Sequence, residues 1–313
     1  MRKLLICLVV FLLSELQSVT AQKYLAAQIP AELKGFANAV IRADERQIII
    51  NSENNMVYRV KRVVTILDKG GSDFTSIHVP YNKSRKIRQL HLNIYNEYGV
   101  VTGKVKQSDF KDESYISDFS LFEDDRVKVF RLPSFEYPVT LELEFELQIS
   151  QTLIIPDWFP QPAEDVSVQY ATLEIVKNPA FELKYTGHGI KALTDTIIEG
   201  KKELMRWRIE NLKARKTEPF SRIKEEILPN LKFTPVKFSY EGITGTYTDW
   251  KSYGSWVYNN LLKGRDDLPL STQEFIKELV KNTRDKREAA KMIYEYAQKK
   301  NRYISVQIGI GGF

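Results

Sequence analysis

The feature that most constrains the fold is a strict alternation of apolar and polar residues between residues 141 and 149. Its apolar members are Leu141, Leu143, Phe145, Leu147 and Ile149, and glutamates and a glutamine fill the gaps. Because successive side chains of a strand point to opposite faces, this segment predicts a strand with one face on a core and one in water. The same two-residue period dominates from Gln47 to about Lys237.

Further strand patterns repeat along this region. They occur at residues 57–67, 90–95, 126–132, 166–176, 181–185 and 204–209. Turn residues separate them, as at 68–71 (DKGG) and 96–99 (NEYG). Strands at a spacing of about 8–12 residues, with turns between them and no long helix, predict a sandwich or a related antiparallel fold.

The pattern changes near Pro229, where prolines and glycines indicate a linker or a long loop. Beyond it the period becomes helical over residues 246–263, 271–280 and 285–297. Ser271 and Asp285 each precede a glutamate at the spacing of a capping box. A strand is predicted at residues 302–308, leading into a glycine-rich end.

Two or three helices and one strand do not easily bury their own apolar faces. The C-terminal part is therefore expected to open a second domain, or else to dock on the β domain. We expect an α+β fold, with a large antiparallel β-sandwich domain at 22–235 and a linker helix and incomplete second domain at 236–313. The apolar faces around Phe275, Ile276, Met292 and Tyr296 are predicted to be poorly covered by the rest of the chain. Unless these helices dock on the β domain, we expect the protein to aggregate or to bind a partner chain.

The N-terminus carries the pattern of an export signal. A positive start, Met1 to Lys3, precedes an apolar run at 4–13 and small residues at 19–21. The run is about ten residues, too short for a bilayer span of roughly 20. A signal peptide at 1–21, cleaved after Ala21, is therefore predicted in preference to an uncleaved anchor, which places the protein in the periplasm or outside the cell with no transmembrane segment after cleavage.

Cysteine usage limits the chemistry of the mature chain. Cys7 is the only cysteine and lies inside the predicted signal. Its removal excludes disulfides, thiolate metal sites and a cysteine nucleophile. No catalytic residue, metal or cofactor is therefore predicted. The formal charge of +6 comes from interleaved acidic and basic residues, which disfavours nucleic acid as a partner.

Other chemical signals are weak. The histidines, at positions 78, 91 and 188, are far apart in strand-like segments. The glutamates at 142, 144 and 146 are expected on a solvated strand face rather than in a cation site. The proline-rich stretch 154–162 is expected to be a connection. Its Trp158 and Phe159 are weak candidates for a ligand site, although such aromatic residues more often cover the end of a core.

Several short tracts together resemble one bacterial exported family, in which an N-terminal domain of unknown function 3857 precedes a transglutaminase-like domain. They occur in order over essentially the whole mature chain, which makes the resemblance specific. The tracts are 137–139 (YPV), 155–161 (IPDWFPQ), 207–212 (WRIENL) with 218–219 (EP), 240–242 (YEG) with Gly245, 249–256 (DWKSYGSW), 262–269 (LKGRDDLP) and 302–313 (RYISVQIGIGGF).

The resemblance implies a β-sandwich of unknown role, followed by the start of a papain-like domain. Such domains use a Cys-His-Asp triad, in which the histidine takes the thiol proton. None of the three residues has a matching position here. The leading hypothesis is a non-catalytic extracytoplasmic binding or scaffold module, with a protein, peptide or glycan as its partner. The alternatives are a truncated part of a cysteine enzyme whose triad lies beyond Phe313, and a carbohydrate-binding sandwich that uses Trp158 and Phe159.

Overall fold

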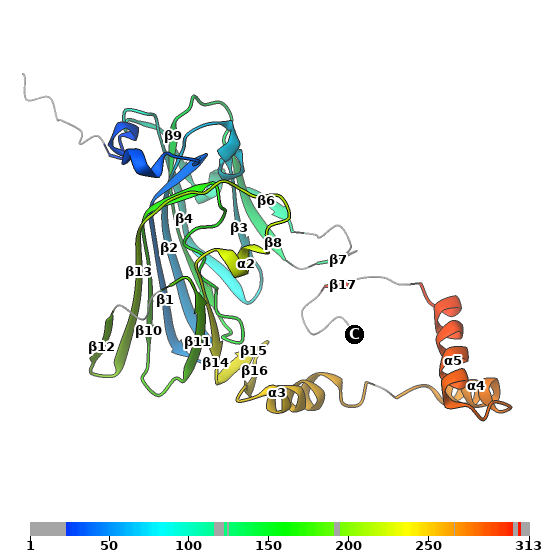
Figure 1. Cartoon of the computed structure of the whole chain (residues 1–313). Coiled ribbons are helices and arrows are strands. Elements are labelled where there is room, and N and C mark those ends of the chain that lie inside the picture. Colours follow the sequence, from blue (N-terminus) through cyan, green and yellow to red (C-terminus); the bar gives the residue numbers. More distant parts are fainter. Residues whose placement is uncertain are drawn as a thin grey trace, which may run out of the picture.

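The computed structural model describes residues 23–115, 122–123, 125–190, 195–265, 267–302 and 306–307. The predicted signal peptide, Cys7 and the glycine-rich end at 308–313 lie outside the described residues. A long twisted sheet forms one layer, and smaller sheets and loops cover one of its faces (Figure 1).

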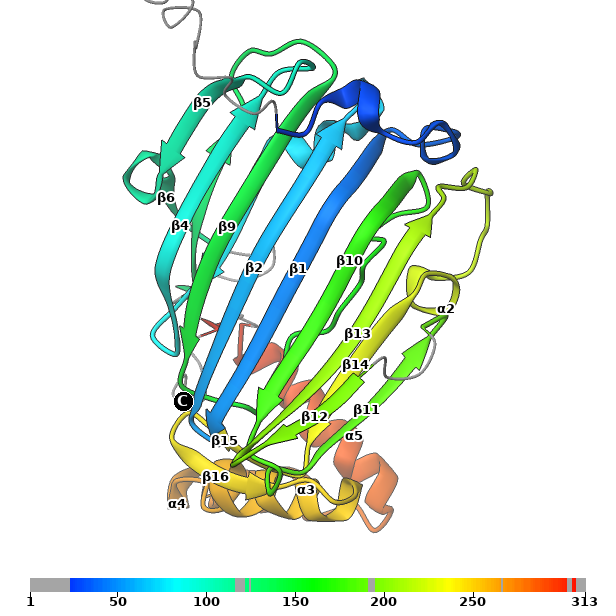
Figure 2. The same ribbon diagram turned by 90° about the vertical axis from the view of Figure 1, so that its left-hand side faces the viewer.

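The large sheet has eight strands and one open face (Figure 2). In spatial order its strands are β12 (Asp195–Glu199), β13 (Lys202–Leu212), β10 (Val166–Lys177), β1 (Ala39–Ser52), β2 (Asn55–Ile66), β9 (Val139–Ile149), β4 (Arg85–Tyr95) and β5 (Val101–Lys106). Neighbours run antiparallel except for the central pair β1 and β10, which run parallel.

The predicted fold class is confirmed, because strands dominate and a short helical segment follows a mainly antiparallel sheet. Strand β1, however, begins well before Gln47. Its first residues, Ala39 to Ile41, are fully buried. The N-terminal segment covers this part of the sheet, with Leu33 packing on Val40, so both strand faces are apolar there. A strand buried on both faces lacks the alternation that reveals a strand in the sequence.

The second layer consists of two smaller sheets on the face opposite the open one. One contains β3 (Ser76–Tyr81), β8 (Arg126–Arg131) and β6 (Lys111–Ser114); the other contains β11 (Leu183–His188) and β14 (Asn230–Pro235). Trp207 of β13 joins the layers, with its ring 5.7 Å from Phe233 and 5.2 Å from Tyr185. The main core lies between the layers.

The remaining short elements connect or cover these sheets. They are η1 (Ala26–Gln28), η2 (Ala31–Leu33), η3 (Lys69–Thr75), η4 (Gln107–Asp109), α2 (Lys224–Ile227), and the strands β7 (Phe122–Glu123) and β17 (Val306–Gln307), which pair in parallel. The predicted turn at 68–71 opens η3, where Asp68 Oδ1 accepts a hydrogen bond from Gly70 N at 2.7 Å.

The C-terminal segment is helical from Trp250 onward, as predicted. The linker or long loop predicted from Pro229 is wrong, because β14 follows Pro229 directly and places Leu231 and Phe233 in the main core. A hairpin of β15 (Lys237–Tyr240) and β16 (Ile243–Thr246) precedes α3 (Trp250–Val257), η5 (Tyr258–Leu262), α4 (Leu270–Val280) and α5 (Lys286–Lys300). Asp285 caps α5 by accepting from Arg287 N at 2.9 Å. The predicted capping box at Ser271 is wrong, because α4 starts at Leu270 behind Pro269 and no side chain caps it.

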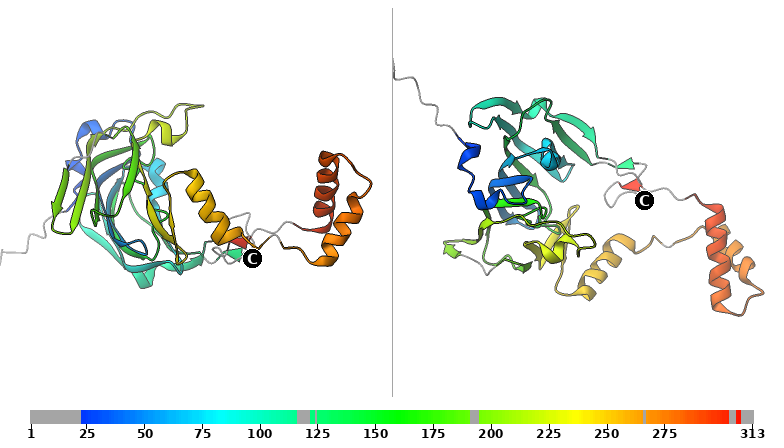
Figure 3. Two further views of the ribbon diagram at one scale, coloured as in Figure 1. Left: turned by 90° about the horizontal axis from the view of Figure 1, so that it is seen from below. Right: turned by 45° about the horizontal axis from the view of Figure 1, so that its top comes forward.

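Helices α4 and α5 pack on each other and stand away from the sheets (Figure 3). Neither helix contains a buried residue. No helix in the described part of the chain is long and apolar enough to cross a membrane.

Candidate functional site

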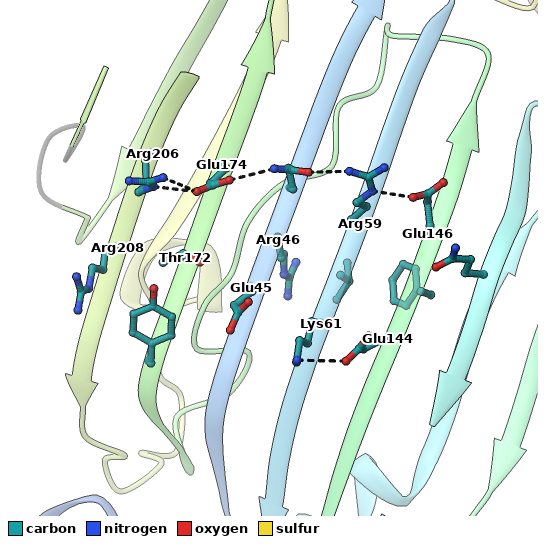
Figure 4. Close-up of a pocket in the computed structure, with 15 residues that line it drawn as sticks. Glu45, Arg46, Arg59, Lys61, Glu144, Glu146, Thr172, Glu174, Arg206 and Arg208 are labelled. Atoms are coloured by element: carbon teal, nitrogen blue, oxygen red, sulfur yellow. Dashed lines mark hydrogen bonds and ion pairs between the residues drawn. The ribbon is translucent and has the colours of Figure 1, made fainter. Parts of the chain in front are cut away.

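A groove of about 600 Å³ crosses the open face of the large sheet (Figure 4). Its lining comes from strands β1, β2, β4, β9, β10 and β13. Because side chains alternate along each strand, every second residue of these strands faces the groove. Most of the residues that do so are charged or amide side chains.

Five of these side chains form a continuous row across the sheet, here called the charge ladder. They are Arg206, Glu174, Gln47, Arg59 and Glu146, and strand register places each directly opposite the next. Arg206 donates to Glu174 at 2.9 Å, and Gln47 donates to the same carboxylate at 3.1 Å. Arg59 donates to the Gln47 amide oxygen at 3.1 Å and to Glu146 at 2.7 Å.

A second, less continuous row lies two residues along each strand. Lys61 lies 3.3 Å from Glu144, and His91 Nε2 lies 3.1 Å from the same carboxylate. The Arg59 side chain is 51% exposed and that of Lys61 is 37% exposed. Exposed pairs of this kind contribute only about 0–1 kcal/mol each, so a ligand with charges of its own can exchange partners with them at small cost.

A buried polar cluster around Glu142 lies next along the same face of β9, two residues before Glu144 and outside the lining of the groove. The Glu142 carboxylate accepts hydrogen bonds from Lys23 at 2.6 Å, Tyr24 at 2.8 Å, Tyr95 at 2.5 Å and Asn93 at 3.2 Å. Burial opposes its ionisation, but these hydrogen bonds prevail and lower the pKa of Glu142 to about 2. The expectation of a solvated strand face is therefore wrong for Glu142, which is 2% exposed.

The N-terminal segment is what buries Glu142. Besides Lys23 and Tyr24, it is held by Arg42, whose guanidinium donates to the carbonyl of Leu25 at 3.3 Å. Ala26 N donates to the carbonyl of Glu97 at 2.9 Å. The N-terminal segment thus covers the strand face at Glu142 and leaves the rows at Glu144 and Glu146 open.

The two aromatic residues singled out in the sequence lie away from this groove. Trp158 has no exposed surface and belongs to the main core, where its backbone pairs with Leu231. Phe159 is partly buried, with Lys224 Nζ 5.4 Å from its ring centre. The neighbouring Gln161 fixes this connection by donating to the carbonyls of Val166 and Lys213.

The histidines stay apart in the fold, on β3, β4 and β11. Within the described residues, no group of three histidine, cysteine, aspartate or glutamate side chains is placed to hold a metal ion.

Sequence reasoning missed the charge ladder. Its members have an ordinary signal, the polar alternate positions of β1, β2, β9, β10 and β13, but which of these side chains meet depends on strand order. In particular it depends on the parallel pairing that places Glu174 beside Gln47. Nothing in the local pattern of either strand specifies that neighbour.

A match to a known protein family assigns the chain to that family. The model of a domain of unknown function with a solved structure, DUF3857, matches residues 52–216, which is more than half of the chain. The chain belongs to the DUF3857 family. The DUF3857 match contains β2, β9, β10 and β13, which carry most of the charge ladder.

A solved structure shares the fold of this DUF3857 chain, and others match it more weakly. A crystal structure of a proposed protease from Parabacteroides distasonis is 15% identical with a TM-score of 0.61, over 84% of this chain and 50% of that one. An M1 zinc metallopeptidase from Deinococcus radiodurans is 10% identical with a TM-score of 0.31, over 78% of this chain and 53% of that one. The chain thus spans about half of these proteins. No functionally curated protein matches it.

Proposed function

We propose that this chain is a non-catalytic extracytoplasmic binding or scaffold module, and that its binding site is the groove on the open face of the large sheet. The observation that carries the proposal is the charge ladder, a row of paired charges on a broad concave surface. A ligand with charges of both signs can satisfy such a row. A polypeptide segment has that chemistry, and a neutral glycan does not.

The proposed division of the chain follows the sequence. Residues 1–21 are the export signal, 22–235 the binding domain, and 236–313 the linker helix and the start of a transglutaminase-like domain. The exposed apolar faces of α4 and α5 support the last point, because an opening fragment of a domain has no core of its own.

A second candidate function is that the module belongs to a longer cysteine enzyme. The observation that favours it is that the chain spans only half of the proposed protease whose fold it shares. Sequencing the gene past the Phe313 codon tests this candidate: an open frame with a Gly-Asp-Cys motif supports it, and a stop codon refutes it.

The binding proposal is tested by selecting peptides from a displayed random library on the mature protein. Selected peptides are expected to carry charges of both signs and to bind more weakly at 0.5 M salt, because screening weakens exposed ion pairs. Arg59→Glu places two acids side by side at Glu146 and is expected to weaken binding at least about tenfold.

Arg131→Glu is the matched control, because Arg131 also pairs with one glutamate, Glu113, and is 58% exposed, but lies on the small sheet. Peptides that bind both variants as they bind the parent would refute the groove as the site. Amide-hydrolysing or acyl-transferring activity of the purified mature chain would refute the non-catalytic assignment.

A further inference from the structure

A second cavity, of about 290 Å³, lies on the covered face of the large sheet, opposite the groove. Its floor is a patch of two adjacent strands, where Val64 of β2 pairs with Leu141 of β9 and Arg62 pairs with Leu143. Its wall comes from η3 and β3, through Asp73, Phe74, Ser76, Ile77 and His78. Because β2 alternates, Arg62 points to this face while Arg59 and Lys61 point to the groove.

Arg62 belongs to a buried charge cluster with a surplus of positive charge. The Asp44 carboxylate is fully buried, and Arg46 binds it with Nε at 3.0 Å and Nη2 at 2.8 Å. Arg62 Nη2 reaches the same carboxylate at 3.1 Å. Burial opposes the ionisation of Asp44, but the two guanidinium groups lower its pKa below the usual range. Two cations therefore share one anion, which leaves the buried cluster itself with one net positive charge.

Arg62 also has hydrogen-bonding capacity that the fold leaves unused. Its Nε is buried and has no hydrogen-bond partner. Leaving a buried donor unpaired is costly, more so when the donor is charged. The side chain as a whole is 26% exposed, so a small molecule in the cavity can reach it, and a turn of the side chain brings the buried Nε to that molecule. A carboxylate is the complement of a guanidinium edge, because its two oxygens accept two parallel N–H bonds.

The other side chains that line the cavity determine the size and polarity of the ligand that it can hold. Val64, Leu141, Leu143, Phe74 and Ile77 offer an apolar surface beside the single cation. The volume is near the lower end of ligand cavities, which run from roughly 300 Å³ upward. That size suits one aliphatic side chain with its carboxylate. Asp73 is an acid at the exposed rim, and it opposes an anion there.

We propose that this cavity binds a small apolar carboxylate, with the acid on Arg62 and the aliphatic group on the leucine floor. The carboxylate belongs either to a free short-chain acid or to the C-terminal residue of a peptide. This site is separate from the groove and on the other face of the sheet.

The test uses the mature chain and nuclear magnetic resonance titration with N-acetyl-L-leucine, which carries the carboxylate, and N-acetyl-L-leucinamide, which does not. Saturable binding of the acid is expected, with the amide at least about tenfold weaker, as for the loss of a charged hydrogen bond. Arg62→Gln is expected to weaken the acid to the level of the amide. Asp73→Asn is expected to tighten it a few-fold, since it removes the opposing charge.

Arg126→Gln is the control, because Arg126 also pairs with an aspartate, Asp112, but lies at the other end of β8, opposite Tyr81, which does not line the cavity; it is expected to change nothing. Arg62→Gln leaves Arg46 on Asp44, so the buried acid stays paired. If that variant nonetheless unfolds, Leu143→Phe, which narrows the cavity from its floor and places a flat ring where the aliphatic group would lie, is expected to weaken acid binding. The tripeptide Gly-Gly-Leu separates the two sources: tighter binding than the acetylated acid assigns the site to peptide ends, and weaker binding assigns it to free acids.

The proposal is overturned if acid and amide bind equally, if neither binds, or if a folded Arg62→Gln or Leu143→Phe variant binds the acid like the parent. None of these results bears on the groove, because the library experiment reads the opposite face of the sheet.

Discussion

At the scale of single residues, Glu142 is the side chain whose surroundings depart most from what its pattern indicates. It occupies the same alternation as Glu144 and Glu146, yet Lys23 and Tyr24, about 120 positions earlier in the chain, enclose it. The alternation of β9 could be predicted from the sequence because it is local. The burial of one glutamate in the row could not, because it depends on a segment with no regular pattern.

Replacing Glu142 by glutamine is predicted to make the protein less stable in a pH-dependent way. The pKa of Glu142 is about 2 in the folded chain and near 4.5 when unfolded. Its carboxylate therefore stabilises the fold fully above about pH 4.5, and this contribution disappears as the pH falls through about 2. Glu142→Gln is expected to cost on the order of 2 kcal/mol at pH 7 and less than half of that near pH 3.

Urea unfolding of both proteins at pH 7, 4.5 and 3 measures this difference. Glu146→Gln is the control, because Glu146 lies on the same strand face but in the open row, and little change is expected at any of these pH values. A Glu142→Gln deficit that stays constant from pH 7 to pH 3 would show that packing, and not ionisation, is responsible.

At the scale of elements, local patterns located the long strands and the C-terminal helices, but missed β14, β15 and β16, whose prolines and glycines indicated a linker, and they located the partners of each element poorly. Strand β9 and helix α5 were recognisable because their periods are complete and their ends are marked. The parallel neighbour of β1 was not, because pairing between strands over a hundred residues apart is decided by the whole sheet. The charge ladder depends on those neighbours, and so it became visible only in the folded chain.

The hairpin of β15 and β16 shows how closely an element can depend on one small residue. Gly245 lies against the aromatic side of α3, where an added Cβ would be 2.5 Å from Phe238 Cζ and 2.7 Å from Trp256 Cδ1. Trp256 Nε1 donates to the Thr244 carbonyl at 2.8 Å. A methyl group at position 245 therefore has to displace the ring of Phe238 and that of Trp256, which strains this hydrogen bond.

Gly245→Ala is predicted to loosen the contact between the hairpin and α3, at a cost of about 1–3 kcal/mol, as for other overpacked sites. Amide hydrogen exchange in residues 237–257 is expected to rise by at least about tenfold in the variant. Gly254→Ala is the matched control. Nothing lies within 4 Å of a Cβ at that helical position, so alanine is expected to be neutral or to stabilise α3 by up to about 1 kcal/mol. Equal exchange in the two variants would contradict this account.

At the scale of the whole molecule, the α4–α5 pair raises a question that its own sequence left open. Its helices were predictable from their hydrophobic period. Whether they dock on the β domain was not predictable, because an apolar helix face does not specify which surface packs against it. In the folded chain the two helices meet each other, with the rings of Phe275 and Tyr296 4.7 Å apart, and stand away from the sheets.

The apolar surface of this pair is large enough to affect behaviour in solution. Phe275 is 46% exposed, Leu270 is 68% exposed and Ile293 is 36% exposed. Exposed apolar patches of this kind drive association in water, because burial of apolar surface contributes about 25 cal/mol per Å². The isolated chain is therefore predicted to self-associate through α4 and α5 as its concentration rises.

Light scattering during size-exclusion chromatography, from about 1 to 100 μM protein, measures this association. These concentrations are chosen because weak apolar contacts have dissociation constants in the micromolar range. The double variant Leu270→Gln, Ile293→Gln removes apolar surface without adding charge or breaking the Phe275–Tyr296 contact, and it is expected to shift association to at least about tenfold higher concentration. The double variant Glu274→Gln, Glu295→Gln is the control. Both side chains are exposed on the same two helices and their replacement leaves the apolar surface unchanged, so association like that of the parent is expected. A parent chain that stays monomeric throughout the range, with α4 and α5 resistant to protease, would mean that the pair is covered within one molecule, and the proposal that these helices open a further domain would lose its structural support.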